Sequence, residues 1–220
     1  MEIKENFKKV IHNLPDNVTL VAVSKTKPDE LIEEVYKLGH RDFGENKVQD
    51  LKGKAERLPK DINWHMIGQI QTNKIKDFIS FVHLVHGVDR IKVLEHLNKE
   101  ASKIGRVVDA LIQVHIAKED SKSGFSFEEA SQVMTSENLK LYPNVRIRGL
   151  MGMASFTDNQ NHIKEEFSKL KQLFNQYQKK IGLSQFDTLS MGMSGDCKVA
   201  IREGSTMIRI GTALFGKRNY

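Results

Sequence analysis

The sequence predicts an α/β fold, a single (β/α)8 TIM barrel with an extra N-terminal helix. Short, mostly apolar strand patterns alternate with amphipathic helix patterns along the whole chain, and the connections between them are short. Strands that are joined by crossover helices run parallel to one another. About eight such strand–helix units follow in sequence, which is the number that closes a barrel.

The first strand pattern covers Val18 to Ser24, a run of β-branched and other apolar residues that is typical of a buried strand. Before it, Ile3 to Leu14 has apolar residues at helical spacing, which predicts the extra amphipathic helix. After it, Asp29 to Leu38 predicts the first crossover helix, and Gly39 is expected to end that helix.

The other elements continue the alternation. Further strands are expected over Arg41 to Asn46, Asn63 to Gly68, Phe81 to Val88, Val107 to Ile116, Val145 to Ala154, Thr188 to Met191 and Met207 to Gly211. Further helices are expected over Lys47 to Leu58, Asn73 to Ser80, Asp89 to Ile104, Phe127 to Ser136, Asp158 to Ile181 and Asp196 to Glu203, with Asp89 and Asp196 as caps. A doubly wound open sheet is the alternative. Such a sheet normally has fewer strands and a glycine-rich turn after the first, and no GxGxxG pattern follows Ser24.

Composition limits the class of protein. With 220 residues and 39% hydrophobic content, residues 1–220 are expected to form a single globular domain. No apolar run could span a bilayer, and the charged N-terminus lacks a signal-peptide pattern. Cys197 is the only cysteine, which fits a reducing cytoplasm. The net charge of +6 comes from lysines mixed with acidic residues, so neither a membrane nor a nucleic-acid partner is expected.

Lys25 stands where the first buried strand ends. A partly desolvated lysine has a lowered pKa, and its neutral amine attacks carbonyl groups to form a Schiff base. Strand ends also commonly carry lysines whose ammonium group lies in water, and for this segment alone that simpler interpretation stays open.

The loops after strands seven and eight of such barrels often build a phosphate site. Here the seventh strand runs into the segment from Ser190 to Asp196, and the eighth ends at Arg209 to Thr212. Both segments combine glycine with a hydroxyl side chain, Ser194 or Thr212, which suits close approach of a phosphate group. Alternatively, the glycines only permit tight turns and Thr212 caps a helix.

Arg209 lies near the end of the eighth strand, where its permanent charge requires a partner. That partner is a ligand or a structural ion pair with Glu203 or Asp196. A Schiff-base lysine, a phosphate site and an arginine donor on one face together suggest pyridoxal phosphate. The rival hypothesis is an aldolase-type enzyme in which Lys25 attacks a phosphorylated sugar.

Several segments resemble the pyridoxal phosphate homeostasis protein family, which is related to the N-terminal barrel of alanine racemase. These segments are Ala22 to Pro28, Phe43 to Asn46, Trp64 to Gly68, Leu189 to Ser194 and Gly204 to Thr212. The resemblance implies a protein that stores, buffers or delivers pyridoxal 5'-phosphate and so serves vitamin B6 and amino-acid homeostasis. It implies no established catalytic activity, so the protein is expected not to be an enzyme.

The resemblance also implies a role for individual residues. Lys25 would hold the cofactor as a Schiff base, Asn46 would lie beside its ring, and Arg209 would face the pyridine nitrogen. The phosphate would be bound by Ser194, Gly195, Gly211 and Thr212. Lys122 would be a second cofactor contact or a solvated loop lysine, and the second interpretation is slightly favoured.

Histidines are not expected to bind a metal. His83 and His86 should point to opposite faces of their strand, and His65 is expected to be a hydrogen-bonded histidine of the core.

Weak catalysis is expected from Arg209, because an arginine hardly protonates the pyridine nitrogen and the ring is then a poorer electron sink. Alanine racemase also uses a tyrosine, and the four tyrosines here fall on helices, in a loop and at the terminus. The expected partners are pyridoxal phosphate and pyridoxal-dependent apoenzymes, and a monomer is expected. An amino-acid racemase-like enzyme is the alternative.

Overall fold

Eight parallel strands follow one another around a closed barrel, and β8 pairs with β1 to complete it. The computed structural model describes residues 2–119, 123–181 and 186–216. The strands are β1 (Thr19–Val23), β2 (Asp42–Glu45), β3 (Asn63–Met66), β4 (Leu84–Val88), β5 (Val108–Val114), β6 (Val145–Gly152), β7 (Thr188–Ser190) and β8 (Met207–Ile210). The predicted (β/α)8 barrel is confirmed, and closure excludes an open sheet.

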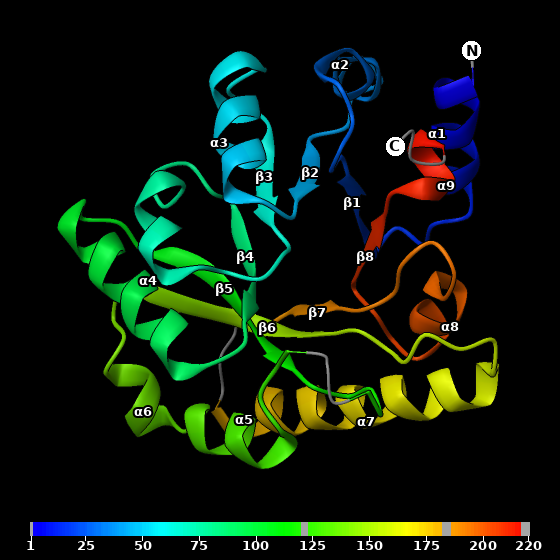
Figure 1. Cartoon of the computed structure of the whole chain (residues 1–220). Coiled ribbons are helices and arrows are strands. Elements are labelled where there is room, and N and C mark those ends of the chain that lie inside the picture. Colours follow the sequence, from blue (N-terminus) through cyan, green and yellow to red (C-terminus); the bar gives the residue numbers. More distant parts are fainter. Residues whose placement is uncertain (1, 120–122, 182–185, 217–220) are drawn as a thin grey trace.

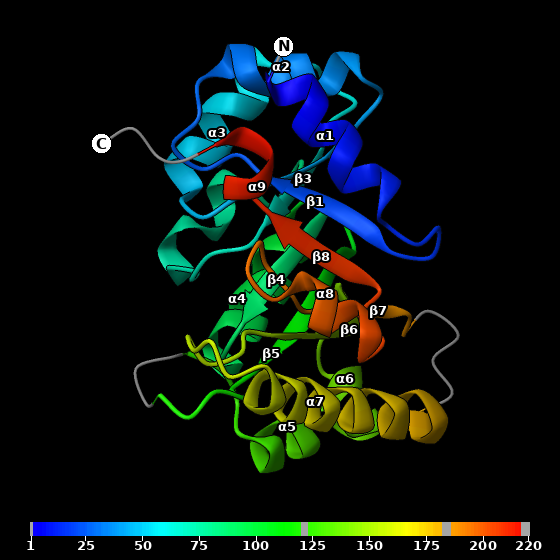
Figure 2. The same ribbon diagram turned by 90° about the vertical axis from the view of Figure 1, so that its right-hand side faces the viewer.

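Helices lie around the outside of the barrel (Figure 1). They are α1 (Glu2–His12), α2 (Asp29–Lys37), α3 (Val48–Arg57), the 3-10 helix η1 (Thr72–Asp77), α4 (Ile91–Lys103), α5 (Phe127–Val133), α6 (Ser136–Lys140), α7 (Gln160–Ile181), α8 (Cys197–Arg202) and α9 (Thr212–Phe215). The extra N-terminal helix, α1, lies beside α9 (Figure 2), where the Asn6 amide donates to the Leu214 carbonyl at 3.3 Å. Within the described part of the chain, no helix is long and apolar enough to cross a membrane.

Two of the expected helix caps differ from the prediction. Helix α4 begins one residue later than expected, with Arg90 at the N-cap, because the Asp89 carboxylate is instead paired with the Arg90 guanidinium at 2.5 Å. Asp196 does occupy the N-cap position of α8, but its side chain makes no capping bond. It accepts a hydrogen bond from the Met193 amide and thereby closes the loop after β7.

Two helical segments also differ from the pattern. The helix expected over Phe127 to Ser136 ends earlier, at Val133, as α5, and a separate helix, α6, begins at Ser136. Ser126 and Glu129 form a capping box at the start of α5. The segment after β3 winds as the 3-10 helix η1 rather than as an α-helix.

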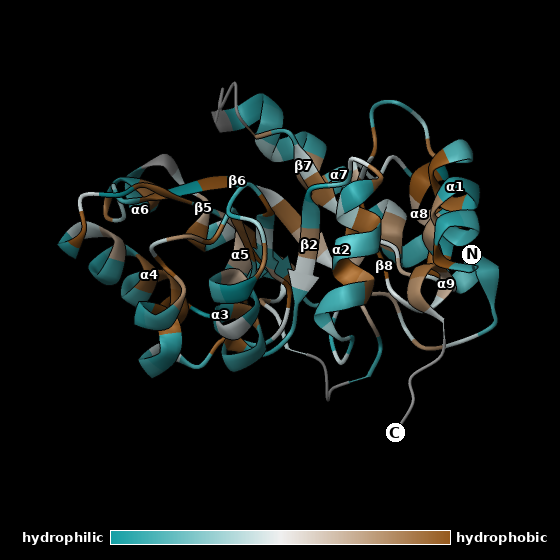
Figure 3. Ribbon diagram, turned by 90° about the horizontal axis from the view of Figure 1, so that it is seen from above, coloured by the Kyte–Doolittle hydropathy of each residue, from teal (hydrophilic) through white to brown (hydrophobic). Residues whose placement is uncertain are grey.

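Apolar side chains fill the space between strands and helices, and Figure 3 shows brown and teal residues interleaved along α1 and α4. Inside the barrel a smaller apolar cluster consists of Val21, Leu84, Leu111, Met151 and Met207. Polar side chains share that interior. His65, His86, Gln113, Ser190 and Arg209 all lie on barrel strands and are buried. Buried polar groups require hydrogen-bond partners, so these residues must contact one another, the backbone or a ligand.

Candidate functional site

One pocket of about 570 Å³ lies at the C-terminal ends of the strands. All the site residues predicted from the sequence line it: Lys25, Asn46, Ser194, Gly195, Arg209, Gly211 and Thr212. Its volume is within the usual range of small-molecule sites. The structure therefore brings together residues from β1, β2, β7 and β8, although their contact with a ligand stays a prediction.

Lys25 is half-buried and lies two residues after the last residue of β1. The turn after it closes with the Lys27 amide donating to the Ser24 carbonyl at 3.0 Å. Thr26 in this turn has a φ of 63°, the only positive φ of a non-glycine residue in the described residues. Such backbone strain persists only where the surroundings enforce it. The Lys27 ammonium group contributes by donating to the carbonyls of Phe215 and Gly216, which ties the turn to the end of α9.

A buried ion pair joins the two strand ends that carry Lys25 and Asn46. The Lys54 ammonium group of α3 lies 2.7 Å from the Glu45 carboxylate and 2.8 Å from the Ser24 carbonyl. The Ser24 hydroxyl donates to the same carboxylate oxygen at 2.6 Å. Burial raises the pKa of Glu45, although Lys54 and Ser24 act in the opposite direction.

Lys54 is a residue of this site that was not predicted from the sequence. Its position three residues after Leu51 and six after Val48 places it on the buried face of α3, and a charged residue on that face was the available signal.

Gly68 allows the chain after β3 to approach Asn46 closely. A Cβ atom at Gly68 would lie 2.2 Å from the Asn46 carbonyl oxygen, so no larger residue fits without a backbone shift. The segment ending at Gly68 therefore fixes the position of Asn46 at the pocket.

The loops after β7 and β8 meet at the predicted phosphate site. The Ser194 hydroxyl accepts a hydrogen bond from the Ala213 amide at 3.4 Å. Gly211, rather than Thr212, occupies the N-cap of α9, so the capping role considered for Thr212 is not observed. Ser194, Gly195 and Thr212 are exposed, and nothing lies within 4 Å of a Cβ placed on Gly195. This part of the pocket is open enough to admit an anion.

Arg209 is the buried cation of the site. One guanidinium nitrogen donates to the Ser190 hydroxyl at 2.5 Å, and another donates to the Gly152 carbonyl at 3.2 Å. Burial lowers the pKa of Arg209 to about 10, whereas the charge of Asp196 acts to raise it. Within the described residues, both hydrogen bonds of Arg209 go to neutral groups. A guanidinium has five N–H donors, so an acceptor in the pocket would suit the remaining ones.

The opposite wall of the pocket was not foreseen. It consists of the chain after β6 and the start of α7, including Met153, Ser155, Phe156 and Asp158. The amide and hydroxyl of Ser155 donate to the buried Glu166 carboxylate at 2.7 and 2.6 Å, which holds this segment in place. Phe156 is fully exposed at the rim. Only contacts with α7 identify this wall, so the local sequence pattern carried no signal for it.

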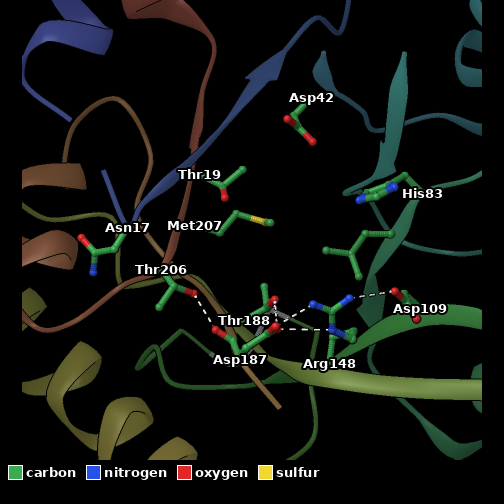
Figure 4. A pocket seen from close by; sticks show the side chains of 11 residues that line it. Asn17, Thr19, Asp42, His83, Asp109, Arg148, Asp187, Thr188, Thr206 and Met207 are labelled. Atoms are coloured by element: carbon green, nitrogen blue, oxygen red, sulfur yellow. Dashed lines mark hydrogen bonds and ion pairs between the residues drawn. The ribbon is translucent and has the colours of Figure 1, made fainter. Parts of the chain in front are cut away.

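A second pocket, of about 440 Å³, lies at the N-terminal ends of the strands (Figure 4). In it Arg148 forms ion pairs with Asp109 at 3.0 Å and with Asp187 at 2.7 Å. Asp42 and His83 line the same pocket.

His65 of β3 and His83, which directly precedes β4, lie side by side near this pocket, with ring centroids 5.3 Å apart. Potential ligand atoms of Asp42, His65 and His83 all lie within 4.8 Å of one another. The prediction that His65 is a hydrogen-bonded core histidine is confirmed, since both its ring nitrogens have partners. Lys122 lies outside the described residues.

Comparisons with known proteins agree with this architecture. Residues 1–219 match the family model of the alanine racemase N-terminal domain. The pyridoxal phosphate homeostasis protein of Vibrio alginolyticus is 43% identical over 212 residues, covering 94% of this chain and 89% of that protein. The protein of the same name from Aquifex aeolicus is 40% identical over 202 residues, covering 91% and 87%.

Solved structures of other proteins share this barrel fold. PipY of Synechococcus elongatus is 33% identical and covers 97% of this chain and 100% of its own. The TM-scores are 0.91 for PipY without PLP and 0.89 for PipY with PLP bound. The barrel of a Clostridium difficile alanine racemase shares the fold, with a TM-score of 0.81 at 11% identity, over 98% of this chain and 56% of that one. The chain therefore belongs to the pyridoxal phosphate homeostasis protein family, whose barrel is that of the alanine racemase N-terminal domain.

Proposed function

We propose that the protein binds pyridoxal 5'-phosphate in the pocket at the C-terminal ends of the strands and stores, buffers or delivers it. One observation carries this proposal: a half-buried lysine, a buried arginine with neutral partners and two hydroxyl-bearing loops line a single pocket. PipY, a relative over its whole length, is described with PLP bound, and other relatives are named for its homeostasis.

Each residue has a role that follows from its chemistry. Lys25 would hold the cofactor covalently, because its primary amine can condense with an aldehyde to a C=N bond while the carbonyl oxygen is released as water. The loops with Ser194, Gly195, Gly211 and Thr212 bind the phosphate through N–H and O–H donors. Arg209 would donate a hydrogen bond to the pyridine nitrogen, and Asn46 would lie beside the ring, as the family resemblance implies.

A carrier fits these residues better than an enzyme. Arg209 is a donor that keeps its own proton, so it does not turn the pyridine ring into the strong electron sink that amino-acid chemistry uses. Among the described residues, no tyrosine lines the pocket, so the second acid–base group of a racemase is not supplied from there. Delivery to pyridoxal-dependent apoenzymes, a monomeric state and a reducing compartment are parts of the proposal that stay predictions.

The visible absorption spectrum of the purified protein tests the proposal. We expect a yellow band with pyridoxal phosphate that is lost in Lys25→Ala and in Lys25→Arg, because neither variant carries a primary amine there. After borohydride reduction, mass mapping should place the adduct on Lys25. The exposed Lys47, next to Asn46, provides the control, and Lys47→Ala should keep the band. A protein that stays colourless with added cofactor, or an adduct on another lysine, would contradict the proposal.

A further inference from the structure

A continuous chain of hydrogen bonds crosses the interior of the barrel from Arg209 to Asp42. The Arg209 guanidinium donates to the Ser190 hydroxyl, which lies 3.1 Å from Nδ1 of His86. Nε2 of His86 lies 3.0 Å from Nδ1 of His65, and Nε2 of His65 lies 3.1 Å from the Asp42 carboxylate. These hydrogen bonds therefore connect Arg209, which lines the pocket that contains Lys25, with Asp42, which lines the pocket at the opposite end of the barrel. Figure 4 shows Asp42 in that second pocket.

Each member of the chain comes from a different strand: β2, β3, β4, β7 and β8. His65, His86 and Ser190 are fully buried, and Arg209 is nearly so. Asp42 at the far end remains partly exposed. Because His65, His86 and Ser190 have no contact with water, a hydrogen bond lost between them cannot be replaced by one to solvent. Such a loss leaves a buried polar group without a partner, which costs free energy of folding.

The two ends of the chain fix the direction of every hydrogen bond in it. An arginine can only donate, and an ionised carboxylate can only accept. If both histidines are neutral, the Ser190 hydroxyl accepts from Arg209 and must donate to His86. His86 then carries its proton on Nε2 and donates to His65, which also carries its proton on Nε2 and donates to Asp42.

The charge states expected for His86 and Asp42 agree with this direction of the hydrogen bonds. Complete burial holds the pKa of His86 well below its ordinary value, and the neighbouring His65 and Arg209 act in the same direction. Burial alone would raise the pKa of Asp42, but the hydrogen bond from His65, with smaller contributions from His40 and Asn63, acts to bring it below its ordinary value. His86 is thus neutral and Asp42 ionised near neutral pH.

We propose that Asp42, His65, His86 and Ser190 are positioning residues for Arg209, which act as one directed relay. The proposal rests on the proposed function, because Arg209 is there assigned to the pyridine nitrogen. Because the Ser190 hydroxyl donates its hydrogen to His86, its oxygen can only accept a hydrogen bond from Arg209. This hydrogen bond keeps the guanidinium directed toward the pocket. The chain also polarises the Ser190 oxygen toward the distant Asp42 carboxylate, which supplies a counter-charge that Arg209 does not touch.

The protonation pattern can be measured without any cofactor. Nitrogen-15 NMR of the histidine side chains in the unliganded protein should show His65 and His86 neutral, each with its proton on Nε2. Ser190→Ala should remove the hydrogen-bond partner of His86 Nδ1 and so shift the nitrogen-15 signal of that atom. A proton on Nδ1 of either ring, or a cationic His86, would reverse the direction of the chain and overturn the relay.

Binding of pyridoxal phosphate gives the second test. Ser190→Ala removes one hydrogen bond to a charged group and leaves Nδ1 of His86 without a partner, so we expect about a tenfold rise in Kd. We also expect a shifted absorption maximum of the bound cofactor. Ser190→Thr keeps the hydroxyl and should restore both values toward wild type. Asp42→Asn, which removes only the distant charge, should shift the maximum in the same direction by a smaller amount.

Two control variants separate the relay from general damage. Ser205→Ala removes another buried hydroxyl, whose oxygen lies within hydrogen-bond distance of the carbonyls of Leu189, Met191 and Met207, at 3.1, 2.8 and 3.0 Å. Asp109→Asn removes a carboxylate at the same end of the barrel that pairs with Arg146 and Arg148 instead. Both controls should keep the wild-type spectrum and Kd.

The two proposals fail in different ways. If the wild-type protein binds no pyridoxal phosphate, the proposed function is wrong, and the relay is still decided by the NMR experiment. If the wild type binds it but Ser190→Ala and Asp42→Asn both keep its spectrum and Kd, the relay does not position Arg209. Should Ser190→Ala fail to fold, Asp42→Asn and the wild-type NMR spectrum decide the question.

Discussion

At the residue scale, the buried ion pair between Glu45 and Lys54 is the contact with the greatest consequence for the site. Glu45 directly precedes Asn46, and both partners contact Ser24, which directly precedes Lys25, so the pair joins α3 to the ends of β1 and β2. Replacing one partner of a buried pair leaves an uncompensated charge, which costs far more than an exposed pair contributes.

Lys54→Met should therefore lower the free energy of unfolding by about 3 kcal/mol near neutral pH. Because burial raises the folded-state pKa of Glu45, the stability linked to this carboxyl is present at low pH and is lost as the pH rises through that pKa. Denaturant titrations should show a larger loss at about pH 8 than at about pH 5.

Lys52 on the same helix provides the matched control. It is half-exposed and lies 3.8 Å from Asp77, so Lys52→Met should change the stability by less than about 0.5 kcal/mol at either pH. Equal effects of the two substitutions would show that the Glu45–Lys54 pair contributes no more than a surface contact.

At the scale of elements, the ends of the strands decide how precisely the pocket is built. The chain leaving β3 passes against the backbone of Asn46 at Gly68, and the turn leaving β1 is fastened to α9 through Lys27. The contact at Gly68 is backbone against backbone, and Lys27 reaches the end of α9 through hydrogen bonds from its ammonium group to two backbone carbonyls. Changes at these points should therefore affect both stability and ligand binding.

Gly68→Ala should destabilise the protein by about 2 kcal/mol, because its Cβ would overlap the Asn46 carbonyl and force the ends of β2 and β3 apart. We also expect weaker binding of pyridoxal phosphate, measured by titration of the cofactor absorbance.

The same substitution at Gly53, in the middle of α3, meets only the end of the Arg57 side chain. Gly53→Ala should leave binding unchanged and stabilise the helix by about 0.5 to 1 kcal/mol. A Gly68→Ala protein with wild-type stability and affinity would contradict this account of β3.

At the scale of the whole molecule, the barrel separates two chemically different ends. The pocket with Lys25 and Arg209 opens at the C-terminal ends of the strands, where barrels of this type place their function. The described tyrosines do not line this pocket: the Tyr36 hydroxyl bonds to Asp61, Tyr142 lies between α6 and β6, and Tyr177 is buried on α7. The proposed carrier and its racemase-like alternative therefore differ in whether amino-acid chemistry occurs at this pocket.

Exchange of the α-hydrogen of an amino acid with solvent deuterium measures this difference. In the presence of pyridoxal phosphate, we expect the protein to exchange alanine no faster than Lys25→Ala, as followed by proton NMR. An alanine racemase of the same concentration serves as the positive control. An exchange rate of the α-hydrogen well above that of Lys25→Ala would instead support the racemase-like alternative.

The sequence alone predicted the barrel and most strand boundaries, because alternating apolar patterns and their lengths are local properties of the chain. Lys25, Asn46 and Arg209 could be predicted as site residues because each stands at the end of such a strand. The loops with glycine and a hydroxyl side chain could be predicted as a phosphate site because they follow the seventh and eighth strands. Helix starts were less certain. Asp89 pairs with Arg90 instead of capping α4, and a side chain with two available partners cannot be assigned from spacing.

Only the tertiary structure decided which polar groups meet inside the barrel. His86 and Ser190 are 104 residues apart in the chain, and their contact depends on barrel closure and on the register of β4 and β7. The Glu45–Lys54 pair and the wall formed by Ser155 and Glu166 depend likewise on how a helix packs against a strand end. Local periodicity determines which elements form and which face each buries, whereas hydrogen bonds between distant strands exist only once the closed barrel fixes their distances.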